Sequence, residues 1–148
     1  MPADLPSAVL FVCTQNVIRS VMAEAMMKHF YGHKVYVQSC GVKPGTRDPF
    51  VTAVMDEMGI DTARHRPRSF ADIEDASFDL VISLSPEAHH RALELTRTMA
   101  IEAEYWPTMD PSITMGSREQ ILDSYRDVRD TLMRKIRQRF GSGAARGV

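Results

Sequence analysis

The segment AVLFVCTQNVIRS, residues 8–20, gives the clearest indication of how this 148-residue chain folds. Residues 8–12 are continuously apolar, which is typical of a strand buried on both faces of a parallel sheet. Residues 21–31 follow with the apolar spacing of a helix. The loop between them, residues 13–18, begins with a cysteine and is followed by an arginine. A strand that leads into a helix through so short a loop is one unit of an alternating α/β chain.

The rest of the chain continues this alternation. Asp48 and Ser85 each precede a proline. This pair is typical of a helix start, with an N-cap residue before a first-turn proline, and Gly59 is a helix stop signal. We therefore expect an α/β fold with a single domain, in which a four-stranded parallel sheet is flanked by helices on both faces. The further strands are expected at 34–39, 79–84 and 102–106, and the further helices at 49–58, 69–76, 85–97 and 117–140.

The composition is that of an ordinary globular domain. The chain has 44% hydrophobic and 25% charged residues and a formal net charge of −1. It therefore lacks the basic surface of a nucleic-acid or membrane-surface binder, and no apolar run approaches the roughly 20 residues needed to span a bilayer. We expect one domain over residues 7–140 and a disordered tail of small residues at 141–148.

Two cysteines, Cys13 and Cys40, are too few for a disulfide framework. The N-terminus has no basic leader, so we expect the chain to stay in the reducing cytoplasm. Cys40 ends the second predicted strand, which should lie beside the first. Two interpretations of it stay open: a small buried hydrophobic residue, or a redox partner that forms a disulfide with Cys13 under oxidation.

Right-handed crossovers place the carboxyl ends of all parallel strands at one edge, where open α/β sheets bind their ligands. Cys13, Cys40, Ser85 and the loop after Trp106 should meet there. The functional candidates of the sequence are thus expected to share one site, although they are spread over the whole chain.

A cysteine, five residues and an arginine form the loop at the centre of this predicted edge. Its amide groups, together with the positive end of the following helix, can bind an anion, and Arg19 can bind two oxyanion oxygens at once. The positive electrostatic field of these groups also favours a thiolate at Cys13, which can attack phosphorus and form a phosphocysteine. Ser20 can donate a hydrogen bond to this thiolate, and Asn16 tolerates a left-handed backbone. The expected phosphate-binding residues are Thr14, Gln15, Asn16, Val17, Ile18, Arg19 and Ser20.

A phosphatase also needs an acid that protonates the leaving oxygen. Asp110 follows the fourth predicted strand, so its loop should lie at the same edge as Cys13. Pro111 holds Asp110 in an extended conformation, which suits a carboxyl group that has to stay over a site. We therefore predict Cys13, Arg19 and Asp110 as catalytic residues, with no metal ligand and no cofactor.

These motifs resemble the low-molecular-weight protein tyrosine phosphatase superfamily. The resemblance implies a four-stranded parallel sheet, and it implies that Cys13 is the nucleophile, Arg19 the phosphate ligand and Asp110 the general acid, with Asn16 and Ser20 supporting the loop. The matching residues are Val9 to Cys13, Asn16, Arg19, Ser20, Met22 to Glu24, Ser39, Gly59 to Asp61, His65, Arg68, Asp110 and Pro111.

Three residues depart from the phosphotyrosine phosphatase pattern of this superfamily. Gln15 stands where a glycine is usual, Ile18 where a second cysteine is usual, and Ser112 where a tyrosine is usual. The superfamily also contains thioredoxin-coupled arsenate reductases, which relay oxidation through two further cysteines near the end of the third strand. Residues 83–89 contain none. Arsenate reduction would then need an external thiol or a relay through Cys40.

The sequence therefore predicts a metal-independent phosphomonoester phosphatase, with a phosphocysteine intermediate and with phosphotyrosine protein as the substrate that the resemblance implies. Its expected partners are a phosphorylated protein or a small phosphomonoester, and an oxyanion such as phosphate or arsenate. One alternative is an arsenate reductase that uses an external thiol. A second is a non-catalytic module that binds an oxyanion or a phosphopeptide.

Overall fold

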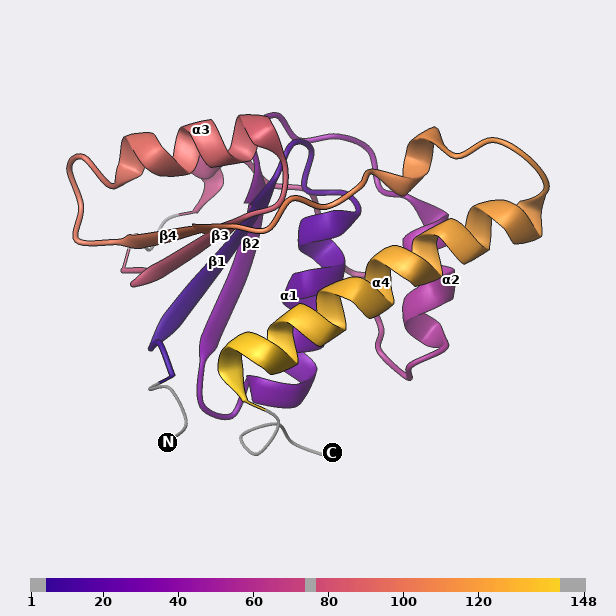
Figure 1. Cartoon of the computed structure of the whole chain (residues 1–148), viewed down its shortest axis with the longest axis horizontal. Helices are drawn as coiled ribbons and strands as arrows, with labels where there is room; N and C mark the ends of the chain where they lie inside the picture. The colour runs from indigo at the N-terminus through magenta and orange to yellow at the C-terminus, as the bar shows by residue number, and fades with distance from the viewer. Residues whose placement is uncertain (1–4, 74–76, 142–148) are drawn as a thin grey trace.

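The computed structural model describes residues 5–73 and 77–141. Four strands form one parallel sheet in the order β2-β1-β3-β4 (Figure 1). Within these residues no helix combines the length and the apolar character needed to cross a membrane. The elements are, in chain order, β1 (Ala8–Cys13), α1 (Arg19–Tyr31), β2 (Tyr36–Gly41), α2 (Pro49–Asp56), η1 (Phe70–Asp72), β3 (Leu80–Ser83), α3 (Pro86–Leu95), β4 (Glu102–Tyr105), η2 (Pro111–Ile113) and α4 (Arg118–Phe140).

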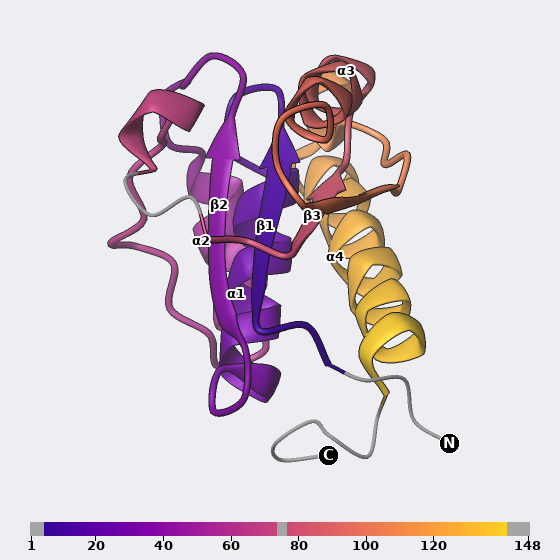
Figure 2. The same ribbon diagram turned by 90° about the vertical axis from the view of Figure 1, so that its left-hand side faces the viewer.

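The strand β1 lies inside the sheet, between β2 and β3, and all six of its residues are buried. This burial explains its unbroken apolar sequence, because both of its faces contact helices. The arrows of β1 and β2 point to the same edge of the sheet in Figure 2. The loop that starts at Cys13 therefore lies at the centre of the carboxyl edge, as the crossover rule predicts.

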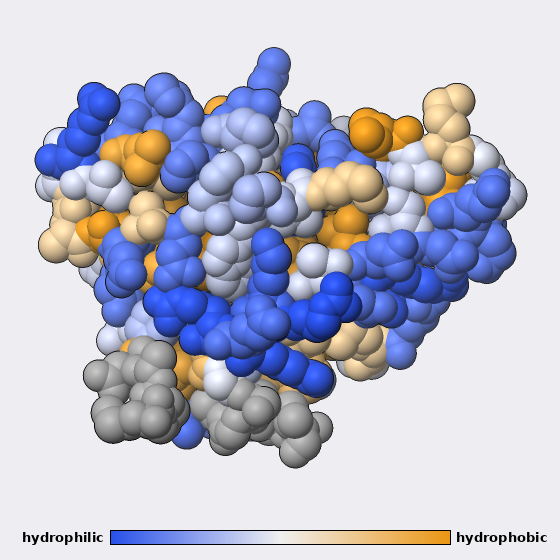
Figure 3. All heavy atoms as spheres, in the orientation of Figure 1, coloured by the Kyte–Doolittle hydropathy of each residue, from blue (hydrophilic) through white to orange (hydrophobic). Residues whose placement is uncertain are grey.

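Helices cover both faces of the sheet. The buried side chains of α1, α2 and α4 form one core with Val9 and Phe11, and those of α3 form a smaller core with Leu10 and Val12 on the opposite face (Figure 1). The outward face of α4 is covered by hydrophilic side chains in Figure 3, while its inward face is buried. The predicted architecture is thus confirmed.

One predicted helix is wrong. The segment expected to be helical at 69–76 contains only the 3-10 turn η1, Phe70–Asp72. Ser69 and Asp72 cap each other reciprocally across this turn, and Ile73 is already extended, with φ −87° and ψ 101°. The remaining positions 74–76 lie outside the described residues, as does the tail from 142 onward. The domain bounds 7–140 stay a prediction.

An ion-pair cluster around Glu57, the C-cap residue of α2, joins this helix to α4. Arg126 donates to both carboxylate oxygens of Glu57, and Arg129 donates to one of them at 2.7 Å. The hydrogen bonds from Arg126, and next those from Arg129, lower the pKa of Glu57 from 4.5 to about 2. A carboxyl group whose pKa is lower in the folded than in the unfolded state stabilises the fold above its unfolded pKa, and this stabilisation fades as the pH falls toward 2.

We therefore expect the replacement Glu57→Gln to flatten the acid branch of the stability profile between pH 4.5 and 2. Urea denaturation at pH values across this window measures the effect as a difference between the slopes of variant and wild type. Asp56→Asn is the matched control, because Asp56 lies beside Glu57 but makes no ion pair within the described residues. Equal slopes for Glu57→Gln and wild type would contradict the prediction.

Candidate active site

A cavity of about 430 Å³ opens at the carboxyl edge of the sheet. It is formed by the loop after β1, the start of α3 and the loop after β4, which are far apart in sequence. Of the positions expected at this edge, Cys13, Ser85 and Asp110 line the cavity, whereas Cys40 does not. Its lining residues are Cys13, Thr14, Gln15, Val17, Ile18, Arg19, Ser85, Pro86, Glu87, Asp110 and Ser112.

The segment 42–45 that follows β2 holds the loop from outside. Its amides donate to the carbonyls of Cys13, Thr14 and Gln15 at 2.9 to 3.1 Å. In a trans peptide the next N–H points opposite to the carbonyl, so the amides of Thr14, Gln15 and Asn16 face away from this segment. The Asn16 amide accordingly donates to Cys13 Sγ at 3.2 Å. The loop backbone is thus oriented for an anion on its inner side.

Asn16 gives the loop its tight turn. It has φ 56°, and among the described residues it is the one non-glycine position with a positive φ. The left-handed backbone expected at Asn16 is therefore confirmed, and Gln15 takes the usual glycine position without a positive φ. The Asn16 side chain is fully buried and donates to Ser20 Oγ and Ser39 Oγ, both at 2.9 Å. These two bonds fix the loop against α1 and β2.

The sulfur of Cys13 lies 2.8 Å from Ser20 Oγ, at the start of α1. Ser20 can therefore donate to a Cys13 thiolate, as its position in the sequence suggested. No side chain caps the N-terminus of α1, whereas Asp48, Ser85 and Ser117 cap α2, α3 and α4. The uncapped amides of α1 and its positive end are left for an anion beside Cys13.

Behind the loop, a buried polar network supports Asn16. Asn16 Oδ1 accepts from the Arg68 amide at 2.9 Å and contacts His65 Nε2 at 3.2 Å, and Ser39 donates to Glu24 at 2.6 Å. Burial lowers the pKa of His65, and the Glu24 carboxylate opposes this effect. All of these residues belong to the family resemblance, but their spacing along the chain did not reveal that they meet at Asn16.

Arg19 connects the loop to the segment that carries the predicted acid. Its Nη1 donates to the Thr108 carbonyl at 2.9 Å, two residues before Asp110. Asp110 Oδ1 accepts from the amide and the hydroxyl of Ser112, at 2.9 and 2.7 Å. No bond within the described residues engages Asp110 Oδ2, which is available to a leaving group in the cavity. Arg19, Asp110 and Cys13 thus line one cavity.

Glu87 is a cavity residue that the sequence did not reveal. Its carboxylate accepts from Thr14 Oγ1 at 2.8 Å, and the same hydroxyl contacts Ser85 Oγ at 3.0 Å. Ser85 and Glu87 are residues that commonly begin a helix. The sequence therefore gave no reason to expect that they also contact the loop. Only the neighbouring positions of β1 and β3 in the sheet bring them to Thr14.

Cys40 lies on the other side of the sheet from Cys13. It pairs in register with Val12 and belongs to the core under α3, whereas Cys13 belongs to the core under α1 and α4. Burial, and next the charge of Cys13, raise the pKa of the Cys40 thiol to about 12. A thiol that stays protonated is a poor redox partner, so the placement favours the interpretation of Cys40 as a buried hydrophobic residue.

Gly41 allows the loop to pack against the end of β2. A Cβ atom there would lie 2.6 Å from the Asn16 amide nitrogen, 2.7 Å from the Gln15 carbonyl carbon and 2.9 Å from the Thr14 oxygen. These are backbone atoms, so the loop itself would have to move. We expect Gly41→Ala to lower kcat/KM for phosphate esters about 10²-fold, the effect of misplacing reacting groups by about 1 Å.

Steady-state kinetics with p-nitrophenyl phosphate checks this prediction. Gly59→Ala is the control, because Gly59 has φ 73° but nothing lies within 4 Å of its added Cβ. That variant should lose stability and keep its activity. Unchanged kinetics of a folded Gly41→Ala variant would show that the loop tolerates the added methyl group.

The protein thus combines a parallel sheet covered by helices on both faces with an oxyanion loop, centred on a thiol, at the carboxyl edge of that sheet. The chain belongs to the family described as low molecular weight phosphotyrosine protein phosphatase, which matches residues 8–143. The protein is therefore an enzyme of this phosphatase family, and the predicted family and fold are confirmed. Among residues 5–73 and 77–141, no group of three or more His, Cys, Asp or Glu side chains is arranged to hold a metal ion.

Similar proteins include both phosphatases and arsenate reductases. The arsenate reductase of Bacillus subtilis (strain 168) is 28% identical over 134 residues, which cover 88% of this chain and 92% of that protein. A solved arsenate reductase in the phosphate-binding state has a TM-score of 0.69 at 29% identity, over 88% of this chain and 94% of that one. A YwlE arginine phosphatase mutant with a phosphorylated active-site serine has a TM-score of 0.70 at 26% identity, over 88% and 91% of the chains.

Proposed function

We propose that the protein is a metal-independent phosphatase that removes phosphate from phosphotyrosine in proteins in the cytoplasm, where its thiol stays reduced. The observation that carries this proposal is that one cavity holds the Cys13 thiol, the Arg19 guanidinium and the Asp110 carboxyl group. Together they supply a nucleophile, an oxyanion ligand and a proton donor. The solved relative with a phosphorylated active-site serine supports a phosphoryl-enzyme intermediate.

In the first step the Cys13 thiolate attacks phosphorus, the bond from phosphorus to the leaving oxygen breaks, and Asp110 gives its proton to that oxygen. Arg19 and the loop amides stabilise the charge that spreads over the equatorial oxygens. In the second step water attacks the phosphocysteine, and the Asp110 carboxylate takes up a proton from it. Inorganic phosphate leaves, and Cys13 is again a thiolate, held by the Ser20 hydroxyl.

An apolar surface beside Asp110 can contact an aromatic substrate, a role for which the family usually has a tyrosine at the position of Ser112. Met109, Ile113 and Met115 are 56%, 72% and 88% exposed, and all three flank Asp110 in the segment between β4 and α4. Orange and tan spheres gather over this segment in Figure 3. Exposed methionine adapts to irregular apolar surfaces. The loop can thus contact the ring of a phosphotyrosine and the apolar residues around it.

The second candidate is arsenate reduction, which the 28% identity to an arsenate reductase favours. Arsenate shares the shape and charge of phosphate, so the same loop can bind it. The chain has two cysteines, Cys13 and Cys40, and Cys40 has a raised pKa on the opposite face of the sheet. Arsenate reduction by this chain would therefore depend on an added thiol.

Two assays on the purified protein separate these functions. The first follows release of phosphate from a phosphotyrosine peptide, and the second follows arsenate reduction with glutathione or thioredoxin as the reductant. We expect turnover in the first assay without a reductant in the reaction cycle. Arsenate turnover with no ester hydrolysis would reverse the assignment. Oxyanion binding without either activity would indicate a binding module.

A further inference from the structure

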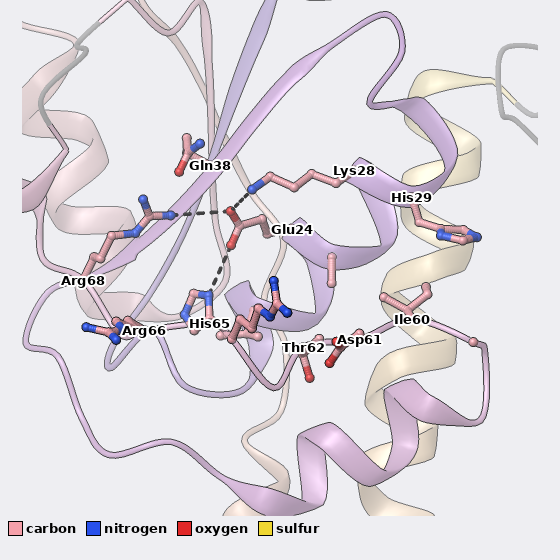
Figure 4. Close-up of a pocket in the computed structure, with 14 residues that line it drawn as sticks. Glu24, Lys28, His29, Gln38, Ile60, Asp61, Thr62, His65, Arg66 and Arg68 are labelled. Carbon is pink, nitrogen blue, oxygen red and sulfur yellow. Dashed lines mark hydrogen bonds and ion pairs between the residues drawn. The ribbon is translucent and has the colours of Figure 1, made fainter.

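A second cavity, of about 730 Å³, lies behind the network that supports the loop. It is formed by α1, β2 and the segment 59–68, and it shares no lining residue with the cavity at Cys13. Figure 4 shows Glu24 near its centre, with dashed lines to Lys28, His65 and Arg68. A concave space of this volume is within the size range of small-molecule sites.

The lining of this second cavity has four Lys and Arg side chains against two carboxylates, Glu24 and Asp61, and so has an excess of positive charge. Lys28 and Arg68 lie 2.8 and 3.5 Å from the buried Glu24 carboxylate, which they neutralise. Arg64 and Arg66 also line the cavity, and neither makes an ion pair with any described residue. Two guanidinium groups are therefore left for an anionic ligand, and this fork geometry suits the oxygens of a phosphate group.

Two polar atoms at the same cavity have no hydrogen-bond partner among the described residues. They are the hydroxyl of Thr62, a residue that is 7% exposed, and the carbonyl oxygen Oε1 of Gln38. Buried polar atoms of native proteins are nearly always paired, so each exception needs an explanation. Both atoms are enclosed, so the polar groups of a ligand would pair with them once these two side chains turn toward the cavity.

We propose that this cavity binds a phosphate-bearing small molecule and that its occupancy regulates the enzyme. The phosphate contacts Arg64, Arg66 and Arg68, and an apolar part of the ligand lies on the apolar side chains of the lining. Gln38 and Thr62 bind its polar groups. The apolar lining residues are Val21, Ala25 and Ile60.

His65 connects this site to the nucleophile loop. One ring nitrogen, Nδ1, lies 3.6 Å from Glu24 Oε1, and the other, Nε2, lies 3.2 Å from both the carbonyl and the side-chain oxygen of Asn16. The Arg68 amide donates to the same Asn16 oxygen at 2.9 Å. A ligand that attracts the Arg68 side chain away from Glu24 therefore changes the contacts of Arg68 and His65. These two residues both contact Asn16, which holds the loop. Binding at the second cavity should alter kcat.

Methylenediphosphonate, a pyrophosphate analogue that resists hydrolysis, is the probe. At the Cys13 loop it competes with p-nitrophenyl phosphate and raises KM alone. At the second cavity it also changes kcat. We expect Arg64→Glu/Arg66→Glu to keep the basal kcat and the effect of the probe on KM, and to lose its effect on kcat. Arg97→Glu/Arg134→Glu makes the same change in net charge at exposed positions that do not line the cavity, and should behave like wild type.

Calorimetry tests binding independently of any catalytic activity, so failure of the proposed function would not hide the result. Arg19→Ala weakens binding at the nucleophile loop, and we expect methylenediphosphonate still to bind this variant. Adding Arg64→Glu/Arg66→Glu should weaken that binding about tenfold or more, the loss of at least one charge-assisted hydrogen bond. Purely competitive kinetics in wild type, or no binding to Arg19→Ala, would overturn the proposal.

Discussion

The Cys13→Ser variant is expected to lose phosphatase activity by more than about a thousandfold, because removing a covalent nucleophile removes the whole two-step path. The serine hydroxyl stays protonated where a thiol ionises, and the described partners of the Cys13 sulfur, the Ser20 hydroxyl and the Asn16 amide, are not bases that could activate it. Cys13 Sγ lies 2.8 Å from Ser20 Oγ, and the Asn16 amide donates to it at 3.2 Å, so the sulfur is held at the loop. The loop, Arg19 and the fold are unchanged, so oxyanion binding should persist.

Steady-state hydrolysis of a phosphotyrosine peptide measures this loss, and calorimetry with inorganic phosphate measures the retained binding. Cys40→Ala is the matched control, because it removes the other thiol of the chain from the opposite face of the sheet. Its kcat should stay within a few-fold of wild type. If Cys40→Ala abolished turnover and Cys13→Ser did not, the nucleophile would be assigned wrongly.

The second large effect is expected for Asp110→Asn. An amide at this position can still accept the two hydrogen bonds from Ser112, at 2.9 and 2.7 Å, but it cannot supply a proton to the leaving group. The expected loss of kcat for phosphotyrosine is roughly 10²- to 10⁴-fold. A phenol such as tyrosine titrates only near pH 10 and needs this proton, whereas p-nitrophenolate is a much weaker base and leaves more readily without it.

The ratio of the two losses is therefore the measurement: Asp110→Asn should reduce turnover of the phosphotyrosine peptide more than turnover of p-nitrophenyl phosphate. Glu87→Gln is the control, since Glu87 is the other carboxylate that lines the same cavity. The Glu87 carboxylate accepts a hydrogen bond from Thr14 and so supports the loop. A loss that depends on the leaving group in Glu87→Gln, and not in Asp110→Asn, would make Glu87 the acid.

Most of the fold could be predicted because each element carries its own local signals. The apolar run of β1, the caps Asp48 and Ser85, and the apolar face of α4 follow from neighbouring residues alone. The predicted helix at 69–76 failed because a mutual cap between Ser69 and Asp72 closes one turn and Ile73 then leaves the helical region. A favourable helix start does not ensure that the helix continues.

The amino-acid sequence was enough to predict the order of strands and helices and the thiol-arginine loop, since these depend on residues close together in the chain. It also placed Asp110 at the edge shared with Cys13, through the rule that crossovers are right-handed. Which distant residues complete the site could not be predicted, because it depends on how the whole chain folds. Glu87 reaches Thr14, and the 42–45 segment orients the loop, because neighbouring strands place their ends side by side.

The folding of the whole chain also gives the two cysteines different surroundings. In the sequence the two cysteines look alike, because each lies at the end of a predicted strand. In the sheet, Cys40 pairs with Val12 and Gly41 pairs with Cys13, so the alternation of side chains sends the two thiols to opposite faces. One thiol meets the uncapped start of α1 and the cavity, and the other is enclosed by apolar side chains. Such a difference depends on strand register, which residues distant in sequence determine together.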